Sequence, residues 1–324
     1  MSAIDRIKQP ISEELVQFDS YFKDVMKTRV PLLNLVMSYL LKRKGKQMRP
    51  ILVFLSAKLL GNPNASTFTA AALIEILHTA TLIHDDVVDD SNERRGFFSI
   101  NAIWKSKVSV LLGDYLLAKG LLLAVNNKEY EMLNIVADAV KEIIEGELIQ
   151  IKHSRRLNVT KDEYYEIIRK KTATLISCCS SCGAKSVGMT DEVVKKMHHF
   201  GELLGIAFQI KDDLLDYQIN SFTGKPTGND IKERKLTLPL IHALELAETS
   251  ERKRILRLLN NSRKNAHDFR EIMDFVTQNH GLAFAEEKLN EYAFMALKEL
   301  DQFSNVEIKD ALREFVEYTI FRNK

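Results

Sequence analysis

A long stretch without proline dominates this sequence. No proline occurs between Pro63 and Pro226, so the middle of the 324-residue chain lacks the strongest helix breaker. The whole chain carries 13 Gly and 6 Pro, about half the average usage of these two residues. We therefore predict an all-α fold. No break in the pattern resembles an interdomain linker, so residues 1–324 are expected to form a single domain.

Charge and hydropathy narrow the possible partners. The 46 Lys and Arg nearly balance the 44 Asp and Glu, and a net charge of +2 provides no basic stripe for a nucleic-acid backbone. The most apolar stretch, residues 108–125, is interrupted by glycines and charged residues, and the charged N-terminus lacks the apolar core of a signal peptide. We expect neither nucleic-acid binding nor a transmembrane segment.

Three cysteines lie close together in one apolar stretch, at Cys178, Cys179 and Cys182. The odd count, with no partners elsewhere, argues against a disulfide framework and predicts a reducing, cytoplasmic location. The spacing of Cys179 and Cys182 also fits a zinc or redox pair, but no second pair completes such a site. We expect small buried residues at a helix contact.

Two DDxxD patterns, beginning at Asp85 and at Asp212, are the main clue to chemistry. Each follows an apolar run with helical spacing, and residues four apart share a helix face, so Asp85 converges with Asp89 and Asp212 with Asp216. Mg²⁺ prefers oxygen ligands and is commonly held by one or two carboxylates together with substrate phosphates. A solvated acidic face is the alternative for either pattern alone, and the presence of both favours a diphosphate clamp.

Two further patterns predict how the surrounding helices begin and pack. Thr160 and Glu163 have the spacing of a capping box, opening a helix that places Lys171 near an inner face. Gly201 and Gly205, four residues apart before the second aspartate pattern, would allow the close approach of a neighbouring helix.

Basic residues accompany the aspartates. Arg94 and Arg95 follow the first pattern, and Lys46 and Arg49 lie in a short Gly-to-Pro segment. Arg suits bidentate phosphate contacts and Lys serves as a point charge. Each could instead be a surface residue, Arg94 and Arg95 could form a local salt-bridge patch, and His78 could be a core histidine.

These residues together resemble the trans-isoprenyl diphosphate synthases, also called polyprenyl synthetases. The resemblance extends from about residue 40 to residue 240. Its matching segments, in order, are GKQMRP (45–50), LHTATLIHDDVVDDSNERRG (77–96), GDYLLAKG (113–120), EGELIQ (145–150), KKTATLI (170–176), GIAFQIKDDLLDY (205–217) and GKPTGNDIKERKLTLPL (224–240).

The resemblance implies an isoprenoid-synthase-type bundle of antiparallel helices around a central active-site cavity. It also implies a Mg²⁺-dependent prenyltransferase that condenses isopentenyl diphosphate with an allylic diphosphate, with about three Mg²⁺ per site that Mn²⁺ could replace. The resemblance implies that Mg²⁺ would be bound by the aspartates of both patterns, Asp85, Asp86, Asp89, Asp212, Asp213 and Asp216, with Asp85, Asp89 and Asp212 as direct ligands. These aspartates, together with Arg94 and Lys171, would be the catalytic residues. The allylic diphosphate would be bound by Arg94, Lys171, Lys225 and Lys235, beside Thr172 and Gln209. The isopentenyl diphosphate would be bound by Lys46, Arg49, His78 and Arg95.

Product length in this family depends on side chains on the helix before the first aspartate pattern. Ala80 and Thr81 are small and lie one turn before Asp85, so the resemblance points to a long-chain product of the octaprenyl kind for quinone side chains. A deeper floor would be provided by Leu77, Ile74 or a residue in 121–123. A farnesyl or geranylgeranyl diphosphate synthase is the alternative. A homodimer is expected, with residues 108–125 supplying the interface, and transient membrane contact would help release a greasy product.

Three other functions fit less well. A terpene cyclase usually lacks the second DDxxD pattern and the basic residues of the isopentenyl site. A non-catalytic subunit of a heteromeric synthase should have lost aspartates, and this chain keeps them all. A cation buffer has no use for the matched Lys and Arg.

Overall fold

The structure is a computed structural model that describes residues 2–42, 45–91, 93, 94, 97–217, 228–261 and 264–321. The side chains of Glu93, Arg94, Arg155, Arg156 and Asn229 are outside this description. The described residues fall into two compact units. The first comprises residues 1–137, 178–197 and 303–312, and the second comprises residues 138–177, 198–302 and 313–324.

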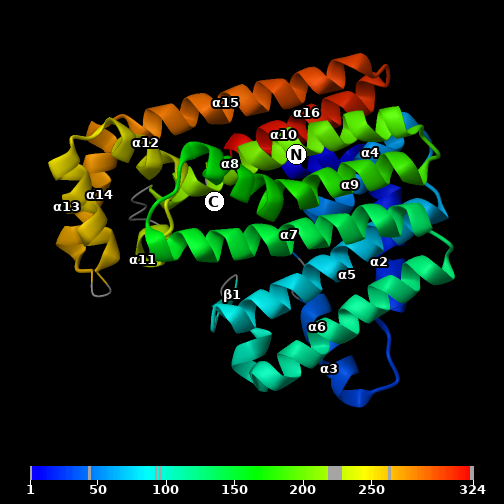
Figure 1. Ribbon diagram of the computed structural model, residues 1–324. Helices are drawn as coiled ribbons and strands as arrows, with labels where there is room; N and C mark the ends of the chain where they lie inside the picture. Colours follow the sequence, from blue (N-terminus) through cyan, green and yellow to red (C-terminus); the bar gives the residue numbers. More distant parts are fainter. Residues whose placement is uncertain are drawn as a thin grey trace. The chain divides into compact units, whose positions relative to one another are not determined.

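The all-α prediction is confirmed, because helices account for nearly all of the regular structure in the described residues (Figure 1). The elements of the first unit are α1 (Ala3–Lys8), η1 (Gln9–Ile11), α2 (Ser12–Met26), α3 (Pro31–Lys42), α4 (Met48–Leu60), α5 (Ala65–Val88), β1 (Glu93–Arg94), β2 (Phe97–Phe98) and α6 (Ile100–Asn126). Those of the second are α8 (Lys161–Ile168), η2 (Arg169–Ala173), α11 (Asn229–Lys232), α12 (Leu238–Leu246), α13 (Thr249–Asn260), α14 (Ala266–Gln278), α15 (Gly281–Glu299) and η3 (Leu300–Gln302). Residues of both units occur in α7 (Tyr130–Arg156), α9 (Thr174–Ser186), α10 (Asp191–Asp216) and α16 (Val306–Phe321).

The strands β1 and β2 form a short antiparallel pair, with Glu93 opposite Phe98 and Arg94 opposite Phe97. The helical pattern gave no sign of this pair. It lies between α5 and α6, immediately after the first group of aspartates.

Helix α5 begins at a capping box, in which the side chain of Asn64 accepts hydrogen bonds from the backbone N–H groups of Ser66 and Thr67. It runs side by side with α6 (Figure 1), and Leu77 of α5 lies buried against Gly120 of α6. This packing fixes the helix that ends in the first DDxxD pattern.

The cysteines pack as small buried residues, as predicted. Cys178, Cys179 and Cys182 are buried in α9 and are not joined in disulfides. Gly183 beside them lets the α9 backbone approach α4 so closely that a Cβ atom there would lie 2.5 Å from the carbonyl oxygen of Val53. Small side chains are therefore required where these two helices meet.

The predicted capping box and glycine pair are both confirmed in the second unit. The Thr160 hydroxyl accepts from the backbone N–H of Glu163, whose carboxylate accepts from the Thr160 backbone N–H, and α8 begins there. Cβ atoms added at Gly201 and Gly205 of α10 would lie 2.5 Å from the Cα of Ser177 and 2.4 Å from the Cα of Ala173. Helix α10 therefore packs backbone to backbone against η2 and the start of α9.

Two helices of the described residues, α5 and α6, are long and apolar enough to meet the length and composition of a membrane span. Both criteria are also met by core helices of globular proteins. In α5, 61% of the most apolar 18-residue stretch is buried within the protein, and in α6 the corresponding share is 33%. Composition alone therefore does not identify a span in either helix.

Candidate active site

The first aspartate pattern lies at the C-terminal end of α5, in the first unit. Helix α5 ends at Val88, and Asp89 is its C-cap residue, donating its backbone N–H to the carbonyl oxygen of Asp85 at 2.8 Å. Asp85 is half-buried and Asp89 exposed, whereas Asp86 is buried. The expected helical geometry therefore extends to the last turn, and the helix ends just before the third aspartate of the motif.

The second pattern lies at the C-terminal end of α10, which ends at Asp216. A helix C-terminus carries partial negative charge from its unpaired carbonyl groups, so carboxylates there are destabilising by about 0.3–1 kcal/mol each. Both aspartate groups therefore occur where a bound cation gives the largest electrostatic benefit.

Asp213 is held by two hydrogen bonds on the buried side of α10. The Tyr164 hydroxyl donates to one carboxylate oxygen at 2.6 Å, and Gln209 Nε2 donates to the other at 2.9 Å. Burial, followed by the negative charge of Asp230, raises the pKa of Asp213 to about 7. Asp213 thus points inward, whereas Asp212 and Asp216 are half-buried.

Asp230 joins this group, although the sequence reasoning did not single it out. Its backbone N–H donates to Asp216 Oδ2 at 2.9 Å. Burial and then the charge of Asp216 raise the pKa of Asp230 to about 6. In the sequence, the one indication that Asp230 belongs to the site is its position shortly after Gly228. A single aspartate has no repeated spacing that would mark it as a site residue.

Two more predicted residues meet beside the second group. The hydroxyl of Thr172, in η2, donates to Gln209 Oε1 at 2.8 Å. Because Gln209 in turn donates to Asp213, Thr172 is connected to the aspartate group through one side chain. The resemblance placed Thr172 and Gln209 in one subsite, and the structure brings them into direct contact.

The predicted diphosphate-binding lysines of the second unit are paired with carboxylates. Lys171 forms an ion pair with Glu147 and donates to Gln150 Oε1 at 2.6 Å, and its side chain is 33% exposed. Lys235 lies 2.5 Å from a carboxylate oxygen of Glu233. The acidic partners are Glu147 of α7 and Glu233, which follows α11. The sequence did not mark either glutamate as a site residue.

The basic residues predicted for isopentenyl diphosphate belong to the first unit. Lys46 is exposed before α4, Arg49 is half-buried in the first turn of α4, and His78 is half-buried in α5. Arg95, Lys225 and the side chain of Arg94 lie outside the described residues.

The residues predicted to set product length lie on α5. Ala80 and Leu77 are buried, and Thr81 is half-buried with its hydroxyl donating to the carbonyl oxygen of His78 at 2.9 Å. The Thr81 hydroxyl is therefore used within the helix itself.

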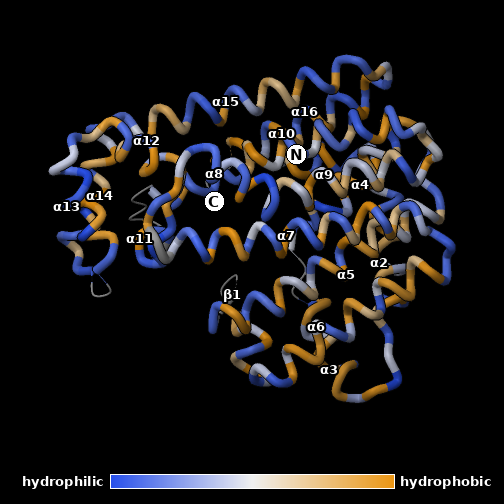
Figure 2. The backbone as a smooth tube through the Cα atoms, in the orientation of Figure 1, coloured by the Kyte–Doolittle hydropathy of each residue, from blue (hydrophilic) through white to orange (hydrophobic). Residues whose placement is uncertain are grey.

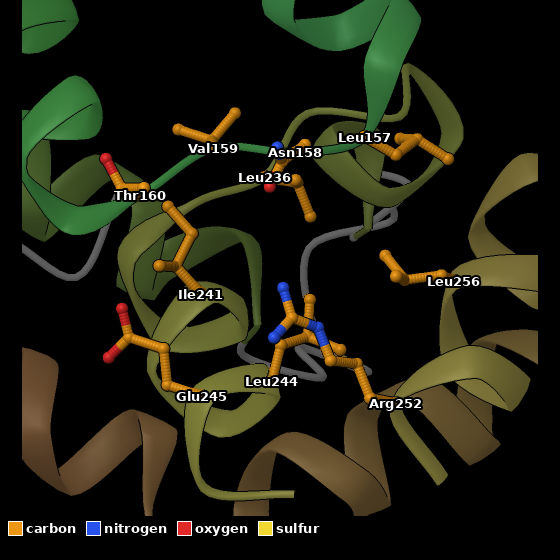
Figure 3. Close-up of a pocket in the computed structure, with 10 residues that line it drawn as sticks. All are labelled: Leu157, Asn158, Val159, Thr160, Leu236, Ile241, Leu244, Glu245, Arg252 and Leu256. Carbon is orange, nitrogen blue, oxygen red and sulfur yellow. The ribbon is translucent and has the colours of Figure 1, made fainter. Parts of the chain in front are cut away.

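The second unit also contains a cavity of about 190 Å³ (Figure 3). Its lining is mainly aliphatic, with Arg252 and Glu245 as its charged side chains, and none of the predicted site residues contributes to it. Its residues are Leu157, Asn158, Val159, Thr160, Leu236, Ile241, Leu244, Glu245, Arg252 and Leu256.

The donor set fits a hard divalent cation. Within the described part of the chain, no three His, Cys, Asp or Glu side chains are grouped as a ready-made metal site. Mg²⁺ usually takes one or two carboxylates and completes its shell with water and substrate phosphates, so a pair of aspartates at each helix end is the donor set that this mode of binding requires.

Comparison with known proteins identifies the family. The polyprenyl synthetase family model matches residues 30–276. The chain is 30% identical to octaprenyl diphosphate synthase of Escherichia coli (strain K12) over 322 residues, which cover 99% of each protein. It is 33% identical to nonaprenyl diphosphate synthase of Mycobacterium tuberculosis over 99% of this chain and 93% of the relative, and 33% identical to geranylgeranyl diphosphate synthase of Saccharolobus solfataricus over 93% and 94%.

Solved structures agree with the sequence matches. A decaprenyl diphosphate synthase from Rhodobacter capsulatus superposes with a TM-score of 0.93 at 34% identity, covering 99% of each chain. A polyprenyl synthase from Caulobacter crescentus CB15, complexed with calcium and isoprenyl diphosphate, gives a TM-score of 0.90 at 33% identity over 99% of this chain and 98% of that one. The chain belongs to the polyprenyl synthetase family, whose members are prenyltransferases.

Proposed function

We propose that this enzyme condenses isopentenyl diphosphate with an allylic diphosphate and releases a long-chain all-trans polyprenyl diphosphate. The observation that carries the proposal is the occurrence of a DDxxD pattern at each of two helix C-termini in a member of this family. The Caulobacter relative, whose structure holds calcium and isoprenyl diphosphate, supports a divalent cation and this substrate class.

The reaction breaks an allylic C–O bond, which leaves a carbocation and a diphosphate. Mg²⁺, when bound, would stabilise the charge that develops on the phosphate oxygens. The residues that would hold it are the aspartates Asp85, Asp86, Asp89, Asp212 and Asp216. Asp213 would hold Gln209 in place through the hydrogen bond between them.

The cationic side chains complete the binding of both substrates. Lys171, Arg94, Lys225 and Lys235 would neutralise the allylic diphosphate, and Lys46, Arg49, Arg95 and His78 would bind the diphosphate of isopentenyl diphosphate. Lys171 exchanges its ion pair with Glu147 for one with the substrate. The double bond of isopentenyl diphosphate then attacks the carbocation, and the released diphosphate accepts the proton that is lost.

The size of the side chains on α5 favours a long product. Ala80 and Thr81 are smaller than a residue that would stop a short product at this turn, and octaprenyl, nonaprenyl and decaprenyl diphosphate synthases are all among the relatives. Such chains serve as quinone side chains. The geranylgeranyl diphosphate synthase of S. solfataricus favours a shorter product as the second candidate.

An apolar face on α6 supports the proposal of a homodimer. Leu111 and Leu122 are 61% and 59% exposed, and Val110, Leu121 and Val125 are also exposed. Hydrophobic residues recur along α6 in Figure 2. Exposed apolar patches of this kind often mark protein–protein contacts.

Two further expectations are part of the proposal. The family model takes in residues of both compact units, which supports a single functional domain over residues 1–324. The buried cysteine thiols suit a reducing compartment, and we place the enzyme in the cytoplasm, with transient membrane contact during release of its product.

The test is incubation of the purified chain with isopentenyl diphosphate, Mg²⁺, and a farnesyl or geranylgeranyl diphosphate primer, followed by chromatography of the dephosphorylated products. A long prenyl alcohol that disappears with EDTA is expected. Asp85→Asn and Asp212→Asn should each reduce turnover by at least about 100-fold. Asp90→Asn is the matched control, because Asp90 is exposed beside the motif with a φ of 48°, which Asn tolerates. A short alcohol overturns the assignment of product length, and no product with either primer overturns the reaction.

A further inference from the structure

The segment that carries Lys171 and Thr172 is a π turn. In η2 the backbone N–H of Thr174 donates to the carbonyl oxygen of Arg169, five residues earlier, in place of the four-residue spacing of an α-helix. Single π turns within α-helices are rare and are found mainly at functional sites. A π turn persists only where the surrounding structure stabilises it against the regular helix.

One carboxylate of α7 contacts both ends of this turn. Glu142 Oε2 lies 2.8 Å from the hydroxyl of Thr174 and 3.3 Å from Nη1 of Arg169. The same hydroxyl lies 3.0 Å from the carbonyl oxygen of Arg169. A single acceptor atom thus links the first residue of the π turn to the residue that follows it.

Other residues of α7 pack directly against the same turn. A Cβ atom on Gly146 would lie 2.9 Å from the Cβ of Lys170 and 3.0 Å from the backbone nitrogen of Lys171, so the two backbones touch. Lys170 donates to Glu145 at 2.8 Å. The position of the turn along α7 is therefore fixed by backbone contact, while Glu142 fixes its shape.

The turn presents its two central residues in different directions. Lys171 contacts Glu147 and Gln150 of α7, whereas Thr172 donates to Gln209 of α10 and is connected through it to Asp213. If the turn relaxed to α-helical pairing, each side chain would rotate by about 100° around the helix axis. Both contacts would then be lost together.

We propose that Glu142 is a positioning residue of the allylic-diphosphate site. It does not contact substrate; it stabilises the π turn that places Lys171 and Thr172. This inference rests on the proposed function for the identity of the ligand, and on the contacts of Glu142 for the role.

Matched variants are available both for Glu142 and for its partner Thr174. Glu142→Ala removes the acceptor, whereas Glu142→Gln keeps an oxygen that can accept both hydrogen bonds. Thr174→Val removes the hydroxyl with little change in shape, whereas Thr174→Ser keeps it. Because Thr174 is buried, Val adds no exposed apolar surface.

The experiment measures steady-state kinetics with each substrate varied in turn, together with urea unfolding. Glu142→Ala and Thr174→Val are expected to raise KM for the allylic diphosphate by at least about tenfold while KM for isopentenyl diphosphate stays within about twofold. Glu142→Gln and Thr174→Ser are expected to stay close to the unaltered enzyme. The double variant Glu142→Ala/Thr174→Val should be no worse than the poorer single variant, because the two residues act as one unit.

Other results would overturn the positioning role. These are a loss of stability with both KM values unchanged, an equal rise in both KM values, or a Gln variant as impaired as the Ala variant. If the unaltered enzyme transfers no prenyl group, the proposed function fails. The positioning role of Glu142 is then tested separately by the binding of inorganic diphosphate in the presence of Mg²⁺. Tighter binding of diphosphate by Glu142→Gln than by Glu142→Ala supports this role, and equal binding by the two variants refutes it.

Discussion

The phenol of Tyr164 and the carboxylate of Asp213 form a 2.6 Å hydrogen bond between α8 and α10, and both side chains are buried. The Tyr164 hydroxyl donates to one oxygen of this carboxylate, and the side-chain amide of Gln209 donates to the other. A buried acceptor that loses its donor costs more than an exposed one, because no water replaces the lost bond.

Tyr164→Phe should therefore lower the free energy of unfolding by about 1–3 kcal/mol. Loss of the donor should also raise the pKa of Asp213, because the hydrogen bond favours the ionised carboxylate. Urea unfolding followed by circular dichroism gives the stability. Tyr165→Phe is the control at the neighbouring position, which is only partly buried, and an equal loss in both variants would contradict the assignment.

Lys105 offers a stabilising substitution. It interrupts α6 with a φ of 69° and a ψ of 162°, a region of backbone conformation that is essentially restricted to glycine. Relief of this strain, offset by the greater flexibility of glycine in the unfolded chain, predicts that Lys105→Gly raises the free energy of unfolding by about 1 kcal/mol.

Lys107→Gly provides the comparison, because Lys107 is an exposed lysine in the regular part of the same helix. It should lose about 1 kcal/mol. The measurement is the free energy of unfolding of the two variants, from thermal or urea unfolding. A loss of stability in both would show that the backbone at Lys105 is unstrained.

Helix contact through Gly205 can be tested by adding one methyl group. Its Cβ would lie 2.4 Å from the Cα of Ala173, the last residue of η2, so a helix must move to accept it. Gly205→Ala should cost about 1–3 kcal/mol or more of stability.

Gly61→Ala is a matched control, because its Cβ would meet a side-chain carbon of Val187 at 3.3 Å, a contact that small shifts relieve. The two unfolding midpoints are the measurement. A smaller effect at Gly205 than at Gly61 would show that α10 and η2 separate easily.

His242 predicts a loss of stability in mild acid. Its ring stacks on Phe284 at a centroid distance of 3.9 Å, and burial, followed by the positive charge of Lys161, lowers the pKa of His242 below 6.5. The unfolded chain therefore takes up a proton at this position before the folded protein does. Stability from this group is complete above about pH 6.5 and declines as the pH falls below that value.

In His242→Phe the stack is retained and the titrating group is removed. Urea midpoints at pH 7.5 and pH 5.5 should differ less in this variant than in the unaltered protein. His267→Phe changes a histidine whose side chain is 81% exposed and should leave the difference as it was. An unchanged pH dependence in His242→Phe would exclude the role of this ring.

Local signals in the sequence predicted much of the helical framework. The capping box at Thr160 and Glu163 depends on residues three apart, and the close approach at Gly201 and Gly205 depends on the absence of two side chains, so both could be read without a structure. The same holds for the aspartates, whose spacing is local. The family resemblance placed Thr172 and Gln209 in one subsite, although they are 37 residues apart, and only the structure showed the hydrogen bond between them.

Other features depend on contacts that no local pattern records. The π turn at Arg169 is stabilised by Glu142, which lies 27 residues earlier on another helix. The same is true of the partner of Lys171, since Glu147 has no distinguishing spacing of its own. The left-handed backbone at Lys105 was missed because a lysine gives no sign of a conformation that glycine normally adopts.

The π turn also has a consequence for how this helix tolerates insertions and deletions. It contains one more residue than the α-helical turn it replaces, so the helix before it and the helix after it are out of phase by about 100°. Removing a single residue from Arg169–Ala173 would restore a continuous α-helix and bring the two segments back into phase. The apolar faces of α8 and α9 would then no longer both point to their present neighbours. A one-residue deletion here should therefore be far more damaging than any substitution of the same residue.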